Sequence, residues 1–170
     1  MKIGILSDTH GNVQRTRQAA QLLKAEACQC VVHCGDIGSE SVLMVLAELL
    51  GAHGIPVYAV LGNVDQSLMQ DLMSFPSSTG VHVCGRRAEL SPEGKKLIVI
   101  HGDDTKFLDE CLESEAYDYI LTGHTHQSEE VSYGKTRLIN PGALHRTATP
   151  SVALLDTNTG QVAFQALFQE

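Results

Sequence analysis

The sequence lacks tryptophan, has few other aromatic residues and contains no long uninterrupted hydrophobic run. Its longest apolar stretches, residues 42–50 and 55–61, are interrupted by Glu48 or Pro56 and fall short of the ~18 apolar residues that a membrane helix needs. The apolar run at residues 3–6 is followed at once by polar residues and is too short for a signal peptide. We therefore expect a cytoplasmic protein that does not enter a membrane.

Basic residues are also scarce. The chain has 12 Lys and Arg against 20 Asp and Glu, which gives a formal net charge of -8. Such a surface repels the phosphate backbone of a nucleic acid, so we expect no nucleic-acid polymer as a partner.

Cysteine is present in an odd number, five, and in no paired C-x-x-C pattern. Cys28, Cys30 and Cys34 lie close together, in and beside an apolar run that is typical of a strand. This usage argues against a disulfide framework and indicates reduced thiols in a hydrophobic core, which fits the cytoplasm.

The remaining composition is that of one ordinary globular domain. The chain has 170 residues, of which 43% are hydrophobic and 19% charged, and its mean hydropathy is -0.02. A chain of this length hides about two thirds of its unfolded surface in a core. No repeat, low-complexity segment or long linker divides the sequence, so we expect a single domain over residues 1–170.

The first half of the chain alternates apolar runs with amphipathic segments. Asn12 stands where a helix N-cap should be, and Ser39 begins a second helical pattern that ends at Gly51. We expect strands at residues 2–7, 30–33 and 56–61, a helix after Asn12, and further helices at 39–50 and 66–73. This β-α-β-α-β order predicts a parallel sheet.

The second half is richer in strands. Ser91-Pro92-Glu93-Gly94 has the turn chemistry of a hairpin between residues 87–90 and 95–100, and a helix is expected at 105–113. Further strands are expected at 117–121, 129–133, 135–139, 151–156 and 161–168.

Five polar clusters follow the carboxyl ends of predicted strands. They are Asp8-Thr9-His10, Gly35-Asp36, Gly62-Asn63-Val64-Asp65, His101-Gly102-Asp103-Asp104 and Gly123-His124-Thr125-His126. Ligands of open α/β sheets bind beyond the carboxyl ends of the strands, so we expect these clusters to meet in one crevice.

Each cluster alone also has a structural interpretation. Asp8 or Asp36 can be a helix cap or a turn residue, and His101 can be an ordinary loop histidine. The pair His124 and His126 is harder to explain by packing. The combination of five clusters, each with a side chain that can bind a metal, is what favours a metal site.

In their order along the chain, these motifs resemble those of the calcineurin-like metallophosphoesterases. The resemblance spans residues 1 to about 150, and the beginning at residues 2–10 together with Asn140-Pro141-Gly142 points to the small bacterial and archaeal phosphodiesterase branch. It implies an α/β fold, a four-layer α/β/β/α sandwich of two mixed β-sheets flanked by helices. It also implies a centre of two divalent metal ions at one edge.

The resemblance assigns the metal ligands residue by residue. Asp8, His10 and His126 would hold one ion, Asn63, His101 and His124 the other, and Asp36 would bridge them. Carboxylate, imidazole and amide ligands without thiolate suit Mn²⁺, our first expectation, and also Fe, Ni²⁺, Zn²⁺ and Mg²⁺.

The implied function is hydrolysis of a small phosphoester, with a bridging hydroxide attacking phosphorus in line. Asp36, Asn63, His101 and Asp65 would then be catalytic, Asp65 by orienting a metal ligand; a helix cap is the alternative role for Asp65. Many larger family members have histidine at the position of Val64, where valine cannot protonate a leaving group. We therefore favour phosphodiester over phosphomonoester cleavage, and expect either slow turnover or substrates whose leaving group needs little protonation.

Three further residues lie near these motifs in the sequence. His145 and Arg146 follow the turn at residues 140–142 and are predicted to contact substrate phosphate. His33 precedes the Gly-Asp motif, and we favour a supporting or core role for it.

The main alternative function belongs to another class, since the same small fold serves as a scaffold subunit in the eukaryotic retromer coat. A scaffold needs no metal ligands, whereas all seven family positions carry a competent side chain here. A metal buffer or sensor is a third and weaker hypothesis. A homo-oligomer is compatible with the sequence.

Overall fold

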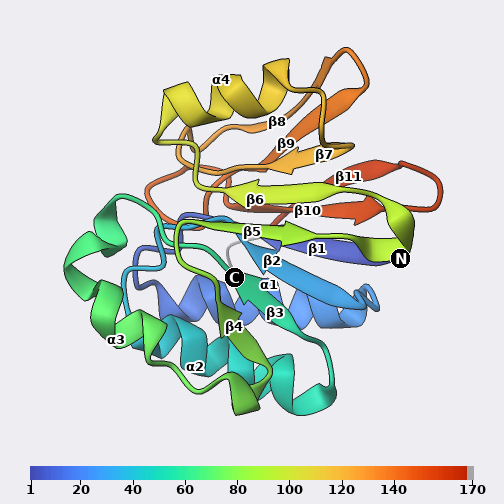
Figure 1. Ribbon diagram of the computed structural model, residues 1–170. Coiled ribbons are helices and arrows are strands. Elements are labelled where there is room, and N and C mark those ends of the chain that lie inside the picture. Colours follow the sequence, from blue (N-terminus) through green and yellow to red (C-terminus); the bar gives the residue numbers. More distant parts are fainter. Residues whose placement is uncertain (168–170) are drawn as a thin grey trace.

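The computed structural model describes residues 1–167 and has two β-sheets packed face to face between helical layers (Figure 1). The larger sheet has the strand order β11-β10-β1-β2-β3-β4, and the smaller one has the order β5-β6-β7-β9-β8. Helices α1, α2 and α3 cover the outer face of the larger sheet, and α4 covers that of the smaller one. The predicted α/β sandwich of two mixed sheets is confirmed.

The larger sheet holds the parallel strands that the first half of the sequence predicts. Strands β1 to β4 run parallel to one another, and β10 and β11 extend the sheet by antiparallel pairing. The strands are β1 Lys2–Leu6, β2 Cys30–His33, β3 Val57–Ala59, β4 Val81–Val83, β10 Ser151–Asp156 and β11 Val162–Ala166. Phe168, the end of the last predicted strand, lies outside the described residues.

The smaller sheet combines two hairpins with two parallel pairs. β5 pairs antiparallel with β6 across the predicted turn, and β6, β7 and β9 run parallel. The strands are β5 Arg87–Leu90, β6 Leu97–Ile100, β7 Tyr119–Leu121, β8 Ser128–Tyr133 and β9 Thr136–Pro141. A second hairpin is formed by β8 and β9, which correspond to the strands predicted at 129–133 and 135–139.

The helices are α1 Val13–Ala25, α2 Glu40–Leu49, α3 Met69–Met73 and α4 Thr105–Glu113. Asn12 caps α1 as expected, with its side chain accepting a hydrogen bond from Arg15 N. The segment predicted as one helix at 66–73 divides into a 3₁₀ turn, η2 Val64–Leu68, followed by α3. Short 3₁₀ turns also occur at η1 Gly51–His53, η3 Ser77–Thr79 and η4 Pro92–Gly94. No helix among residues 1–167 is long and apolar enough to cross a membrane.

Three apolar layers hold the molecule together. One layer lies between the two sheets and contains Ile5, Val32 and Val99. A second layer lies between the larger sheet and helices α1 and α2, and contains Leu6. Because both faces of β1 and β2 are buried, these strands are continuous apolar runs. A third, smaller layer joins α4 to the second sheet.

All five cysteines are free, and four of them, Cys28, Cys30, Cys34 and Cys111, are buried. Burial raises the pKa of Cys28 to about 11 and that of Cys30 to about 12, so both stay protonated thiols at neutral pH. The expectation that Cys28, Cys30 and Cys34 are core cysteines is confirmed.

Candidate metal centre

The five polar clusters lie at the carboxyl ends of five strands from both sheets. β1, β2 and β3 of the larger sheet supply the loops with Asp8, Asp36 and Asn63, and β6 and β7 of the smaller sheet supply those with His101 and His124. The clusters therefore meet where the two sheets come together, with three loops from one sheet and two from the other.

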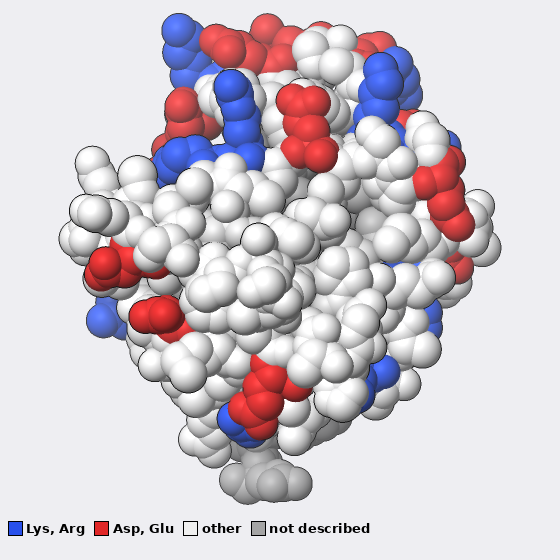
Figure 2. Space-filling view, turned by 60° about the horizontal axis from the view of Figure 1, so that its bottom comes forward, with Lys and Arg blue, Asp and Glu red and all other residues white. Residues whose placement is uncertain are grey.

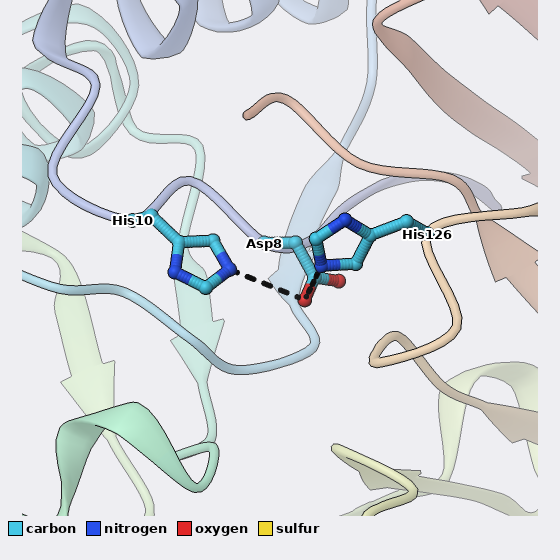
Figure 3. A group of neighbouring side chains, drawn as sticks. All are labelled: Asp8, His10 and His126. Carbon is cyan, nitrogen blue, oxygen red and sulfur yellow. Dashed lines mark ion pairs between the residues drawn. The ribbon is translucent and has the colours of Figure 1, made fainter. Parts of the chain in front are cut away.

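Asp8, His10 and His126 form the first group of side chains (Figure 3). The Oδ1 atom of the buried Asp8 lies 3.1 Å from His126 Nε2 and 3.8 Å from His10 Nε2. The ligand atoms of all three residues lie within 4.8 Å of one another, although His126 comes from the opposite sheet. This is the spacing of three ligands that can share one cation.

Asp36 connects this group to a second one. Its Oδ2 atom lies 3.5 Å from His10 Nε2, and its Oδ1 atom lies 3.3 Å from His101 Nε2. His101 Nε2 also lies 3.2 Å from Asn63 Oδ1, and the His124 ring is 5.1 Å from the His101 ring between centroids. The structure thus brings all seven predicted ligands together, with Asp36 between the two groups.

Two buried atoms of the first group support a metal there. Among the described residues, Asp8 Oδ1 and His10 Nε2 are buried side-chain atoms without a hydrogen-bond partner. An unsatisfied buried carboxylate oxygen costs free energy, and a divalent ion would satisfy both atoms at once. The donor set of carboxylate, imidazole and amide oxygen fits such an ion.

His101 is oriented for ligation by a hydrogen bond on its other nitrogen. Its Nδ1 atom lies 2.8 Å from Cys34 O, which requires the proton to be on Nδ1 and turns Nε2 toward Asp36 and Asn63. Burial lowers the pKa of His101, but the hydrogen bond and charge of Asp36 outweigh burial and leave that pKa raised. Burial raises the pKa of Asp36, but the hydrogen bond and charge of His101, together with the hydrogen bond from the Val64 N–H, outweigh burial. The pKa of Asp36 is therefore lowered.

The backbone around the ligands is strained. Asp8, His10, Asp36, His124 and His126 all have φ between 44° and 68°, in the left-handed region. Such conformations cost of order 1–3 kcal/mol each and cluster at functional sites. Gly62 makes room for Asp36, because a Cβ at that position would lie 2.0 Å from Asp36 Oδ1.

Asp65 fixes the loops that carry the ligands. Its fully buried carboxylate accepts hydrogen bonds from the backbone N–H groups of Ile37, Gly38 and Gly62, at 2.8 to 3.0 Å. Two of these donors follow Asp36 and the third precedes Asn63. Asp65 therefore positions the ligands through their backbone and does not cap the turn that follows it.

His33 and Asn140 support the site in a similar way. The buried His33 accepts a hydrogen bond from Gly35 N and contacts Thr9 Oγ1 at 2.9 Å, and burial lowers its pKa to about 4, so the ring is neutral. Asn140 donates to Gly123 O and Thr125 Oγ1 on either side of His124. The sequence pattern at Asn140-Pro141-Gly142 does not predict this role of the Asn140 side chain.

The predicted substrate contacts lie beside the first group. The His145 ring is 5.4 Å from that of His10, and Arg146 is exposed next to it. Burial, followed by the charges of His10, Arg146 and Arg15, lowers the pKa of His145. Both residues line a pocket of about 560 Å³ together with Arg15, for which the sequence predicted no role.

Val64 lies beside the candidate metal centre and contacts Asp36 through its backbone. Its side chain is 38% exposed, and its backbone N–H donates to Asp36 Oδ1 at 3.0 Å. The backbone therefore contributes to holding Asp36, while the side chain offers no proton.

Comparisons with known proteins agree with this arrangement. Residues 1–160 match the family model of the calcineurin-like phosphoesterase superfamily domain. Phosphodiesterase MJ0936 of Methanocaldococcus jannaschii is 30% identical over 161 residues, which cover 92% of this chain and 93% of that protein.

Solved structures give the same result for the fold. An archaeal phosphodiesterase has a TM-score of 0.88 at 27% identity, with 98% of this chain and 100% of that chain covered. Vps29 of Entamoeba histolytica, in complex with Zn²⁺, has a TM-score of 0.64 at 18% identity, with 98% of each chain covered, and is a likeness of fold alone.

Proposed function

The chain belongs to the calcineurin-like phosphoesterase superfamily, and from this premise we propose that it is a phosphodiesterase with a centre of two divalent metal ions. As a member of this family with a relative named phosphodiesterase, the protein is a hydrolase that acts on phosphoester bonds. The observation that carries the proposal is Asp36, whose two carboxylate oxygens face His10 and His101 separately.

Asp8, His10 and His126 would hold one ion, and Asn63, His101 and His124 the other, with Asp36 shared between them. When bound, two such ions supply a nucleophilic water at neutral pH and positive charge for the nonbridging phosphoryl oxygens. We favour Mn²⁺, which the oxygen and imidazole donors suit.

Neighbouring residues of the chain then hold the ligand loops in position. Asp65 connects the loops of Asp36 and Asn63, and His33 connects those of Asp8 and Asp36. Asn140 holds the loop of His124 and His126. Val64 donates no proton to a leaving group, so we propose phosphodiesters whose leaving group needs little protonation. The net charge of -8 favours a small substrate over a nucleic-acid polymer.

The test is hydrolysis of bis(para-nitrophenyl) phosphate and of para-nitrophenyl phosphate by EDTA-treated protein to which Mn²⁺, Ni²⁺, Zn²⁺ or Mg²⁺ is returned in turn. We expect metal-dependent cleavage, faster for the diester and highest with Mn²⁺. Folded, metal-loaded protein that cleaves neither substrate would contradict the proposal.

A scaffold role is the second candidate, and one surface observation favours it. Figure 2 brings the side of α2 and α3 forward and shows a central area without charged side chains. On those helices Met44, Met69 and Met73 are 59%, 40% and 46% exposed. The filled set of seven ligand positions favours the enzyme, because a scaffold does not need it.

A further inference from the structure

A pocket of about 560 Å³ lies between the first two turns of α1 and the segment at residues 145–147. It adjoins the metal centre on the side of His10, because α1 begins three residues after His10 and His145 belongs to the pocket while its ring lies 5.4 Å from that of His10. A substrate whose scissile phosphate is at the centre can therefore extend into this pocket.

The pocket is positively charged within an acidic protein. Its lining contains Arg15, Arg146 and His145 and no aspartate or glutamate. Among residues 1–167 neither arginine forms an ion pair, whereas Arg17, on the same helix as Arg15, pairs with Glu48 at 3.0 Å. The first turn of α1 also has no acidic residue, so the positive end of the helix dipole is not neutralised by its own side chains.

Arg15 is held in place, whereas Arg146 is exposed. Arg15 Nη1 donates to Leu144 O at 3.0 Å, which fixes the half-buried guanidinium of a residue that lines the pocket. Arg146 has a φ of 51°, a left-handed conformation that costs free energy in a residue other than glycine. Guanidinium groups bind phosphate with paired hydrogen bonds, which lysine cannot reproduce.

We propose that this pocket binds a second phosphate group of the substrate, through Arg15 and Arg146. The substrate is then a phosphodiester that carries a further terminal phosphate, and this inference rests on the proposed phosphodiesterase function. In the reaction, water adds to the scissile phosphorus and gives one proton to solvent, the bond from phosphorus to the leaving oxygen breaks, and that oxygen takes up a proton from solvent. The second phosphate keeps all its bonds and serves for binding.

The test compares two chromogenic diesters that differ in one group: the para-nitrophenyl ester of thymidine 5′-phosphate, with and without a 3′-phosphate. We expect the wild-type kcat/KM to be at least about tenfold higher for the phosphorylated diester, which corresponds to about 1.4 kcal/mol. Arg146→Gln and Arg15→Gln should each reduce this ratio severalfold toward one, and Arg15→Lys should restore it only in part. Arg17→Gln is the matched control on the same helix and should keep the wild-type ratio.

A second measurement separates this inference from the proposed function. Metal-free protein is titrated by calorimetry with thymidine 5′-phosphate and with thymidine 3′,5′-bisphosphate. We expect the wild-type protein to bind the bisphosphate more tightly. The Arg146→Gln variant should lose this preference. If both diesters are cleaved at equal kcat/KM, the phosphodiesterase stands and the pocket proposal is wrong. If neither diester is cleaved with any metal, the proposed function is wrong, and the calorimetric preference alone decides whether the pocket binds a second phosphate.

Discussion

The Nε2 atom of His101 lies 3.3 Å from Oδ1 of Asp36, although the two residues follow strands of different sheets. This contact crosses the interface between β2 and β6 and connects the two halves of the candidate metal centre. Any change at Asp36 therefore acts on ligands from both sheets.

Replacing Asp36 with asparagine should reduce kcat/KM for an aryl phosphodiester by at least about 100-fold, the size of effect seen when a key electrostatic group of an active site is removed. The variant loses the negative charge that faces both His10 and His101. Thermal unfolding followed by circular dichroism should show that the fold survives. Asp71→Asn, at an exposed position of α3, is the control and should keep the wild-type rate. Wild-type rates for Asp36→Asn at saturating Mn²⁺ would show that Asp36 is not shared between ions.

Removal and return of metal should change the stability of the protein. Asp8 Oδ1 and His10 Nε2 are buried without hydrogen bonds, so a bound ion should stabilise the folded state, by about 2.7 kcal/mol at a concentration 100 times its Kd. Scanning calorimetry of EDTA-treated protein should show a Tm that rises as Mn²⁺ is added.

The matched variants for this experiment are Asp8→Asn and His53→Gln. Asp8→Asn should lose most of the rise in Tm, whereas His53→Gln, at an exposed histidine outside the centre, should keep it. An equal rise in Asp8→Asn and wild type would place the stabilising ion elsewhere.

The sequence predicted that the seven candidate ligands converge, because they follow strands that end at one edge. A parallel strand delivers the residue after its last hydrogen bond to the same edge as its neighbours, so Asp8, Asp36 and Asn63 are brought together by local pattern alone. The bounds of α4 were also predictable, since Asp104 caps the helix and accepts a hydrogen bond from Phe107 N.

Local sequence patterns do not predict long-range contacts. The pairing of β10 with β1 and the hydrogen bond of Arg15 to Leu144 O join segments far apart in sequence, and the residues involved look like ordinary strand and helix residues. The left-handed φ of His124 and His126 also has no local signal, because the surrounding fold imposes this strain.

Asp65→Asn should destabilise the metal-free protein by about 2 kcal/mol, because the buried carboxylate accepts three backbone hydrogen bonds and an amide offers only one acceptor oxygen. Urea unfolding measures this loss. Activity should fall as well, through displacement of Asp36 and Asn63, with a larger effect on kcat than on KM. The control is Asp104→Asn, since asparagine caps a helix as well as aspartate does. A stability of Asp65→Asn equal to that of Asp104→Asn would contradict the positioning role.

His33 should make the metal-free protein sensitive to acid. Its pKa is lowered from 6.5 to about 4, mainly by burial, so the folded state favours the neutral ring. The stability that this ring supplies is fully present above pH 6.5 and is lost as the pH falls from 6.5 toward 4, by about 3 kcal/mol in total. Urea unfolding at pH 7 and pH 4 should show that His33→Gln loses less stability than wild type by about this amount.

The comparison of His33→Gln with wild type cancels the titration of other groups, since both proteins retain them. His53→Gln, at an exposed position, should respond to pH as wild type does. A loss of stability between pH 7 and pH 4 that is the same in wild type and His33→Gln would assign the acid sensitivity to other residues.

Val64→His should speed the cleavage of diesters with poor leaving groups. The Val64 side chain is 38% exposed beside Asn63, and its backbone N–H to Asp36 is retained in any variant except proline. An imidazole there can donate a proton to a leaving alkoxide, a role for which general-acid catalysis contributes 10²–10⁴-fold in well-placed cases. We expect about a tenfold gain for a phenyl ester and a smaller gain for the para-nitrophenyl ester, whose leaving group needs little protonation. Val64→Leu keeps the bulk without the proton and should show no gain, so an equal gain in both variants would attribute the effect to packing.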